Sequence, residues 1–149
     1  MIEVKKRVEE NGLVLDYYRR YDGRYALVLE YYCLAGSGVL HRVDGYAVIR
    51  YSCSGVRLVY ACYENGLLHN ENGWALCDDD RYEYYMHGRL HRLDGPAVRY
   101  NNYMYDDYYD MDRAEVMDAY YIDGKLINEE DLEKEVRAYK FYVLNSDVD

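Results

Sequence analysis

The sequence lacks any long apolar run: nowhere in its 149 residues is there a stretch approaching the roughly 18 apolar residues of a membrane-spanning helix. The first residues, MIEVKKRVEENG, also lack the apolar core of a signal peptide. We therefore expect a cytoplasmic protein with no membrane contact.

Basic residues are scarce, with 18 Lys and Arg against 28 Asp and Glu and a net charge of −10. Proteins that bind nucleic acid by neutralising phosphates need the opposite excess. Anionic membrane surfaces are disfavoured for the same reason. We expect no direct nucleic-acid binding and a partner that is basic or neutral, although excess acid also serves solubility alone.

Sequence motifs for catalysis and metal binding are missing. The cysteines Cys33, Cys53, Cys62 and Cys77 include no Cys-x-x-Cys pair, which argues against a zinc site and for buried, reduced thiols. The chain has neither a phosphate-binding Gly-x-x-x-x-Gly-Lys loop nor a Gly-x-Ser-x-Gly nucleophile motif. We expect a protein that is not an enzyme and that uses no metal or other cofactor.

The aromatic residues are unusual, because the chain has one Phe and one Trp but 22 Tyr. A Phe ring gains only from burial, whereas a Tyr ring can pack and leave its hydroxyl for water or for a partner. This composition indicates much aromatic surface that is half-buried or available for binding.

A repeat dominates the middle of the chain. The segment 38–48, GVLHRVDGYAV, recurs at 88–98 as GRLHRLDGPAV, with a weaker copy at 66–76, GLLHNENGWAL. A truncated copy, YIDGKL, follows at 121–126. Aromatic runs that end in Asn65-Gly66 and His87-Gly88 precede two of the copies, and short apolar runs follow them. Short β-rich runs separated by Gly, Asn and Asp predict antiparallel hairpins.

The dipeptide Ser54-Gly55 tests this interpretation. As a two-residue hairpin loop, it pairs Cys53 with Val56, Tyr51 with Leu58 and Ile49 with Tyr60 on one face, and Ser52 with Arg57 and Arg50 with Val59 on the other. The first face is then wholly apolar, and a shift of one residue would lose that match.

The two ends of the chain complete the predicted fold. Strands at 14–20 and 25–32 flank the turn 21–23. Asn128 is a candidate N-cap, with Leu132, Val136 and Tyr139 on one helical stripe, so that the helix would cover an end or face of the sheet. We predict one domain over 1–149, mainly β: an elongated or curled antiparallel sheet of consecutive hairpin repeats at about 12–127, with a C-terminal helix at about 128–140.

The pattern Gly-x-Leu-His-Arg-x-Asp-Gly-Pro-Ala resembles the degenerate MORN-like repeats of phage and viral proteins, over roughly residues 31–136. The resemblance implies an elongated sheet of hairpins that serves as a scaffold or binding surface rather than as an enzyme. In such arrays a copy like 121–126 followed by an acidic helix often ends the chain. Asn70 and Asn72 depart from the pattern, which has Arg and Asp there.

The repeated histidines His41, His69 and His91 allow three interpretations. With Asp44 and Asp94 nearby in sequence they could form a general base, and three His could hold a metal ion. A motif present in several copies is, however, usually the motif that builds the repeat. We therefore favour a structural role, in which His and Asp bond the loop backbone and Arg pairs with Asp locally.

The partner-binding site is predicted in the extra sequence before the last copy, around 101–116, where the spacing between copies lengthens. Its tyrosines and aspartates are Tyr103, Tyr105, Asp106, Asp107, Tyr108, Tyr109, Asp110 and Asp112. Tyr is enriched at interfaces, and clustered acids steer basic partners. The alternative is a solvated acidic loop or short helix.

Three functional classes follow from these observations. The first is a non-catalytic protein-binding module. If the viral resemblance holds, it would be a virus- or phage-encoded inhibitor in the host cell cytoplasm. Such an inhibitor would cover a basic, nucleic-acid-handling surface of a host defence protein such as a CRISPR effector. The second is a small-ligand binder or weak hydrolase that uses the repeat histidines. The third is a structural or virion-associated protein, with a homodimer through sheet edges as a possible assembly.

Overall fold

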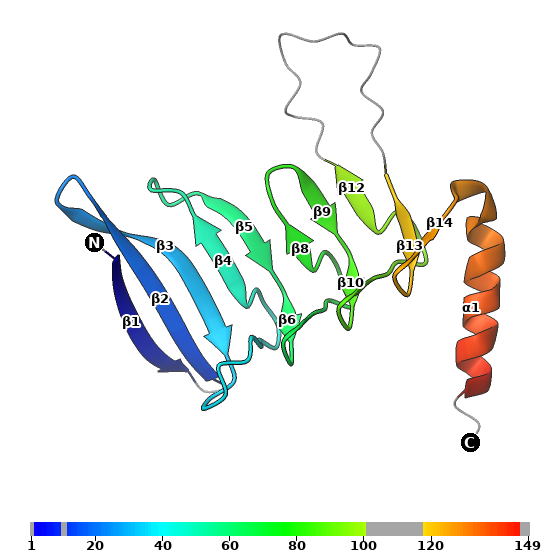
Figure 1. The fold of residues 1–149 in the computed structure, drawn as a ribbon, viewed down its shortest axis with the longest axis horizontal. Coiled ribbons are helices and arrows are strands. Elements are labelled where there is room, and N and C mark those ends of the chain that lie inside the picture. The colour runs from blue at the N-terminus through cyan, green and yellow to red at the C-terminus, as the bar shows by residue number, and fades with distance from the viewer. Residues whose placement is uncertain (1, 10–11, 101–117, 147–149) are drawn as a thin grey trace, which may run out of the picture.

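In a computed structural model that describes residues 2–9, 12–100 and 118–146, the chain forms one long antiparallel sheet, followed by a helix (Figure 1). The strand order is β1-β2-β3-β4-β5-β8-β9-β12. The strands are β1 (Ile2–Glu9), β2 (Gly12–Tyr21), β3 (Arg24–Cys33), β4 (Val48–Tyr51), β5 (Arg57–Ala61), β8 (Leu76–Cys77), β9 (Arg81–Glu83) and β12 (Val98–Tyr100). The predicted mainly β fold of consecutive antiparallel hairpins with one C-terminal helix is confirmed.

Three small hairpins follow one another along the long axis of the molecule (Figure 1). They are β6 (Tyr63–Glu64) with β7 (Leu67–Leu68), β10 (Tyr85–Met86) with β11 (Arg89–Leu90), and β13 (Tyr120–Ile122) with β14 (Lys125–Ile127). Their turns are Asn65-Gly66, His87-Gly88 and Asp123-Gly124, and all six residues have positive φ. Positive φ at both central positions defines the type I′ turn, whose twist matches that of the flanking strands.

The motif alanines form the tightest part of the sheet. Ala47, Ala75 and Ala97 are at most 1% exposed. Each donates its N–H to the following strand and accepts an N–H from the preceding one; for Ala47 these bonds join Ala61 O and Tyr32 N, each at 2.8 Å. A side chain larger than methyl would have to displace packed neighbours here, which explains why the repeat uses Ala.

Strand β1 lies outside the predicted repeat region, which began at residue 12. It pairs with β2 along its whole length. Arg7 explains part of this pairing: its Nε donates to Asp16 Oδ2 at 2.8 Å, and its Nη2 reaches Glu30 Oε2 at 3.3 Å. Asp16 and Glu30 are 5% and 7% exposed, so the guanidinium from the edge strand compensates two buried carboxylates.

Two tyrosines complete the bonding of Glu30. The Tyr32 hydroxyl donates to Oε2 at 2.9 Å and the Tyr51 hydroxyl to Oε1 at 2.6 Å. Burial, with the carboxylate of Glu30 adding to it, raises the pKa of Tyr51 to about 12. Both tyrosines therefore stay protonated donors at neutral pH.

The loop between β4 and β5 differs from the prediction. Ile49 pairs with Tyr60 and Arg50 with Val59 as expected, but Tyr51 pairs with Arg57 and not with Leu58. Ser52 N–H donates to Val56 O at 2.8 Å, which leaves three loop residues instead of two, so the predicted pairs of Cys53 and Ser52 are also wrong. Gly55, at φ 84°, closes this longer loop, and a bulge between Arg50 and Tyr51 restores the register.

The C-terminal helix is longer than predicted. A 3-10 turn, η3 (Glu129–Asp131), leads into α1 (Leu132–Ser146), whereas the prediction ended at about residue 140. Asn128 occupies the N-cap position but makes no side-chain capping bond. The helix lies beside β13 and β14 at the opposite end of the molecule from β1 (Figure 1). No helix in the described part of the chain is long and apolar enough to cross a membrane.

Gly88→Ala tests the requirement for the turn glycines. Gly88 has φ 82°, and an added Cβ would meet Leu67 Cδ2 at 3.2 Å. We expect the free energy of unfolding to fall by about 1–2 kcal/mol, the cost of a left-handed backbone for an L-residue, in urea denaturation. Gly73→Ala is the control, because its Cβ would meet Asn70 Nδ2 at an ordinary 3.5 Å. Equal losses in both variants would contradict the type I′ turn.

Candidate functional site

The repeat histidines join each motif to the next small hairpin. In every case the Nδ1 atom accepts the backbone N–H of the first turn residue of that hairpin. The pairs are His41 with Asn65, His69 with His87, and His91 with Asp123, each at 3.1 Å. An Nδ1 that accepts a hydrogen bond carries no proton, so the neutral imidazole holds its proton on Nε2. The predicted bonding of His to loop backbone is confirmed.

The residue after each histidine closes its own loop. Arg42 Nη1 donates to Tyr46 O at 3.1 Å, and its guanidinium lies 3.7 Å from the centre of the Tyr32 ring. Arg92 repeats this arrangement and also bonds Asp94 at 2.7 Å, the predicted local pair. Asn70, the departure from the repeat pattern, still donates to Trp74 O at 2.7 Å. The main polar positions of the motif are thus used within the scaffold.

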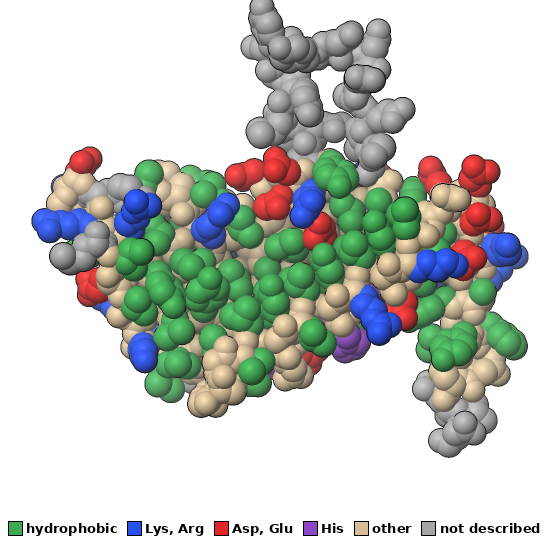
Figure 2. Space-filling model, viewed as in Figure 1, with side chains coloured by type: hydrophobic (Ala, Val, Ile, Leu, Met, Phe, Trp, Pro, Cys, Tyr) green, Lys and Arg blue, Asp and Glu red, His purple; other side chains and the backbone are tan. Residues whose placement is uncertain are grey.

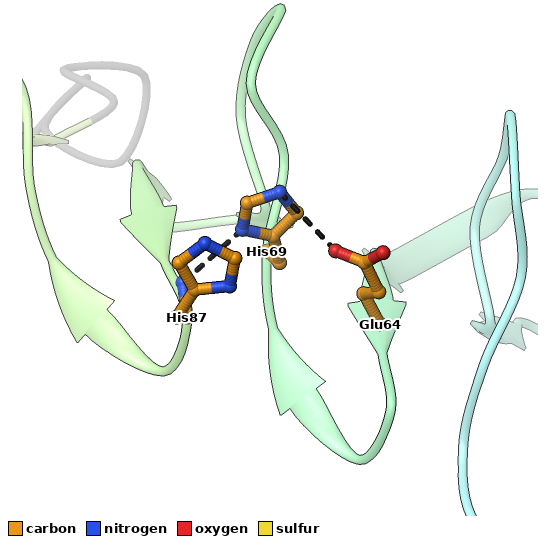
Figure 3. Close-up of side chains that lie close together, drawn as sticks. All are labelled: Glu64, His69 and His87. Atoms are coloured by element: carbon orange, nitrogen blue, oxygen red, sulfur yellow. Dashed lines mark hydrogen bonds and ion pairs between the residues drawn. The ribbon is translucent and has the colours of Figure 1, made fainter. Parts of the chain in front are cut away.

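Glu64, His69 and His87 form a cluster between two neighbouring small hairpins (Figure 3). Their candidate ligand atoms lie within 4.8 Å of one another. His69 Nε2 lies 3.4 Å from Glu64 Oε2. The rings of His69 and His87 are stacked, with centroids 4.3 Å apart and planes inclined by 19°.

This cluster does not suit a metal ion. A histidine that binds a metal donates a proton from its other ring nitrogen. His69 does the reverse, since its Nδ1 accepts the His87 N–H and its Nε2 proton faces Glu64. Two nearly parallel stacked rings also cannot both direct in-plane lone pairs at one ion between them. The arrangement fits a hydrogen-bonded stack that fixes the turn at His87.

The residues predicted to bind a partner, Tyr103, Tyr105, Asp106, Asp107, Tyr108, Tyr109, Asp110 and Asp112, lie outside the described residues. The structure describes only the flanking chain. Val98 and Ala119 form an antiparallel bridge, so the described residues on the two sides of this segment lie next to each other. The choice of these eight residues stays a prediction.

The last turns of α1 carry an exposed apolar surface, which we call the α1 tip: Phe141, Tyr142 and Leu144. These side chains are 72%, 71% and 74% exposed. Figure 2 shows a hydrophobic patch on the part of the helix that projects beyond the body of the protein. The sequence reasoning missed this surface because it ended the helix at about 140. The signal was the run FYVL after Lys140, which leaves the stripe of Leu132, Val136 and Tyr139.

The first half of the helix attaches to the last hairpin. Tyr120 donates to Glu129 Oε1 at 2.9 Å, and Lys125 Nζ lies 3.2 Å from Glu135 Oε2. The Tyr139 ring packs 5.1 Å from that of His91. A hollow of about 330 Å³ lies between this half and the hairpin, with Ile122, Ile127, Ala138 and Tyr142 in its lining. That size is at the lower limit of small-molecule pockets.

His91 makes stability depend on pH. Burial lowers the pKa of His91 below its ordinary value, and Asp123 opposes this only in part. The unfolded chain therefore takes up the proton near pH 6.5, before the folded protein does. The stabilisation by this histidine is complete above that pH and is lost as the pH falls through the folded pKa.

His91→Asn should lower the free energy of unfolding by about 1 kcal/mol at pH 8, the usual value of one net hydrogen bond. At pH 5.5 the difference from wild type should shrink, because Asn has no proton to exclude. Urea titrations at both pH values measure this. His87→Asn is the comparison, since Asn65 occupies the same turn position and this variant removes a ring contact, the stack on His69, instead of a bond to Nδ1. An unchanged difference at the two pH values would contradict the role of Nδ1.

Zinc should leave thermal stability unchanged. A ligand that binds only the folded state raises the melting temperature, and the hydrogen bond that His69 Nδ1 accepts from the His87 N–H disfavours metal binding. We expect equal melting temperatures with a tenfold excess of Zn²⁺ and with EDTA. A rise that His69→Asn abolishes would show that the cluster does bind metal.

Comparison with known proteins adds no relative. The chain matches no family model, no curated protein and no solved structure. The MORN-like resemblance therefore stays a prediction, although the repeat itself is evident in the equivalent contacts of His41, His69 and His91.

Proposed function

We propose that this chain is a non-catalytic protein-binding module that docks through the α1 tip. The observation that carries the proposal is the exposure of three large apolar side chains on one projecting helix end. The only Phe of the chain is among them. Because a Phe ring gains nothing from contact with water, its place at the α1 tip points to burial by a partner.

The spacing of the side chains favours a groove as the docking surface. Phe141 and Leu144 are three positions apart and therefore lie on the same side of the helix. Apolar anchors at such intervals are typical of helices that bind in a hydrophobic groove. The exposed area of the α1 tip is about 400–500 Å², which is less than the ~800 Å² that each partner buries in a stable complex. A groove that encloses the helix can supply the remaining contact.

The acidic residues at the start of the helix indicate a partner with basic residues at one end of that groove, whereas the charges nearer the α1 tip are the basic Arg137 and Lys140. Residues 129–135 carry Glu129, Glu130, Asp131, Glu133 and Glu135 against one Lys. None of the ion pairs found among the described residues uses Glu130 or Asp131. At 1.5 Å per residue, Asp131 lies about 15 Å along the helix from Phe141, so the basic rim would lie at that distance from the apolar groove.

The narrower hypothesis, an inhibitor that covers a nucleic-acid-handling surface of a host defence protein, stays a prediction. Its support is the net charge of −10 together with the acidic tyrosine segment around 101–116. A small-ligand binder or hydrolase has less support, because the Nδ1 atoms of His41, His69 and His91 are already bonded to backbone.

The test is the double variant Phe141→Ser, Leu144→Ser, compared with Val43→Ser, Val56→Ser. The control residues are 63% and 59% exposed and lie in loops that are far from α1 in the sequence. Both variants should keep wild-type stability, because exposed side chains contribute little to it. Proteins captured by wild type are identified and purified, and their affinities are then measured by calorimetry. We expect at least tenfold weaker binding for the α1 tip variant alone, and weaker binding at high salt.

A third variant separates the two candidate surfaces. In it, Asp106, Asp107, Asp110 and Asp112 are replaced by Asn. If this variant loses the partner while the α1 tip variant retains it, the α1 tip is not the docking surface. If all variants bind equally, both sites are wrong.

A further inference from the structure

Strand β1 forms an open edge of the large sheet. It pairs with β2 on one side, and the sheet order ends with it on the other. Figure 1 shows β1 at the end of the molecule opposite α1, with only β2 beside it. In an antiparallel ladder alternate residues of such a strand direct N–H and C=O groups outward, so β1 presents backbone donors and acceptors that no other described strand pairs.

The side chains of β1 would suit an added strand. Ile2, Val4 and Val8 lie on one face of the strand, which they share with Lys6, and are 65%, 46% and 83% exposed. Val4 and Val8 lie opposite Tyr17 and Leu13, so an apolar row on β2 continues to the edge. The strand has eight residues and no Pro, and β1 and β2 stay in register along their whole length without a bulge. These are the properties of a template for β-pairing.

The positive charge of β1 disfavours pairing with the same strand of a second copy of the chain. Lys5, Lys6 and Arg7 occupy the centre of the strand. Antiparallel registers that use most of β1 place Lys5 or Lys6 opposite a lysine of the other copy. Like charges directly opposite each other destabilise a strand pair. The same centre would favour a strand of opposite charge.

The local charge differs from that of the whole protein. Strands β1 and β2 contain five basic residues and three acidic ones, a net of +2, in a chain of net −10. Arg7 is held by Asp16 and Glu30. The side chain of Lys5 is 59% exposed, and its Nζ lies 3.9 Å from Glu3 Oε1. The outermost strand pair, β1 and β2, is therefore basic, whereas the molecule as a whole is acidic.

From this combination we propose that β1 binds an extended acidic segment of a partner protein as an additional antiparallel strand. Its apolar residues would lie beside Ile2, Val4 and Val8, and its carboxylates beside Lys5 and Lys6. Backbone pairing supplies affinity, and the lysines supply selectivity. This inference does not depend on the α1 tip, which lies at the other end of the molecule.

The experiment uses a labelled eight-residue peptide, Thr-Val-Thr-Glu-Glu-Val-Thr-Val (the Val–Glu peptide), whose glutamates lie opposite Lys6 and Lys5 and whose valines lie opposite Val8, Val4 and Ile2 in an antiparallel pair. Its controls are the Val–Lys counterpart, with both Glu replaced by Lys, and a Val–Glu peptide in which Pro replaces the second and third Thr. Binding is followed by fluorescence polarisation at physiological salt. Wild type should bind the Val–Glu peptide at least tenfold more tightly than either control, because Pro removes the ladder donors. The amides of Ile2–Glu9 should gain protection from hydrogen exchange on binding. Lys5→Glu, Lys6→Glu should reverse the preference, whereas Phe141→Ser, Leu144→Ser should leave it unchanged.

Three results would overturn the proposal. One is equal binding of the Glu and Lys peptides by wild type, or a preference that the charge reversal does not change. Another is peptide binding with protection elsewhere than at β1. The third is a concentration-dependent dimer, seen by light scattering, in which the β1 amides are already protected, because the occupant would then be a second copy.

Discussion

The hydrogen bond from a turn N–H to the Nδ1 of the preceding repeat histidine is the contact that sets one repeat on the next. It does not act alone. The glycine of the same turn donates its N–H to the leucine before that histidine, as Gly66 does to Leu40 at 2.8 Å. The residue after the motif glycine covers the next turn. Val39 covers Gly66 so closely that a Cβ added at Gly66 would lie 3.2 Å from Val39 Cγ1. Each repeat thus relies mainly on its neighbours, as in other solenoids.

This arrangement determines where function can lie. The motif uses its histidines, its Arg or Asn and its alanines to hold consecutive strands together, so the polar chemistry of the array is directed inward. The two ends lack a neighbouring repeat. One end presents the bare backbone and lysines of β1, and the other presents the α1 tip with Phe141 and Leu144 exposed. The two surfaces that we propose for binding therefore lie at the two ends of the array.

Much of this fold could be predicted from local patterns. Asn65-Gly66 and Asp22-Gly23 signal their hairpins directly, and the pair Ile49 with Tyr60 follows from apolar matching. The failures concern contacts between distant residues. Strand β1 was missed because Lys5, Lys6 and Arg7 look solvated, and only the fold brings Arg7 to Asp16 and Glu30. The α1 tip was missed because the exposure of Phe141 depends on where the last hairpin ends.

The histidine tautomer is the most direct test of this account. Long-range ¹H–¹⁵N correlation spectra distinguish Nδ1–H from Nε2–H imidazole, and His→Asn variants assign the signals. At pH 8 the account predicts the Nε2–H tautomer for His41, His69 and His91, with unprotonated Nδ1 atoms that accept the turn amides. An Nδ1–H tautomer at any of the three would contradict it, because that nitrogen would then be a donor facing a donor.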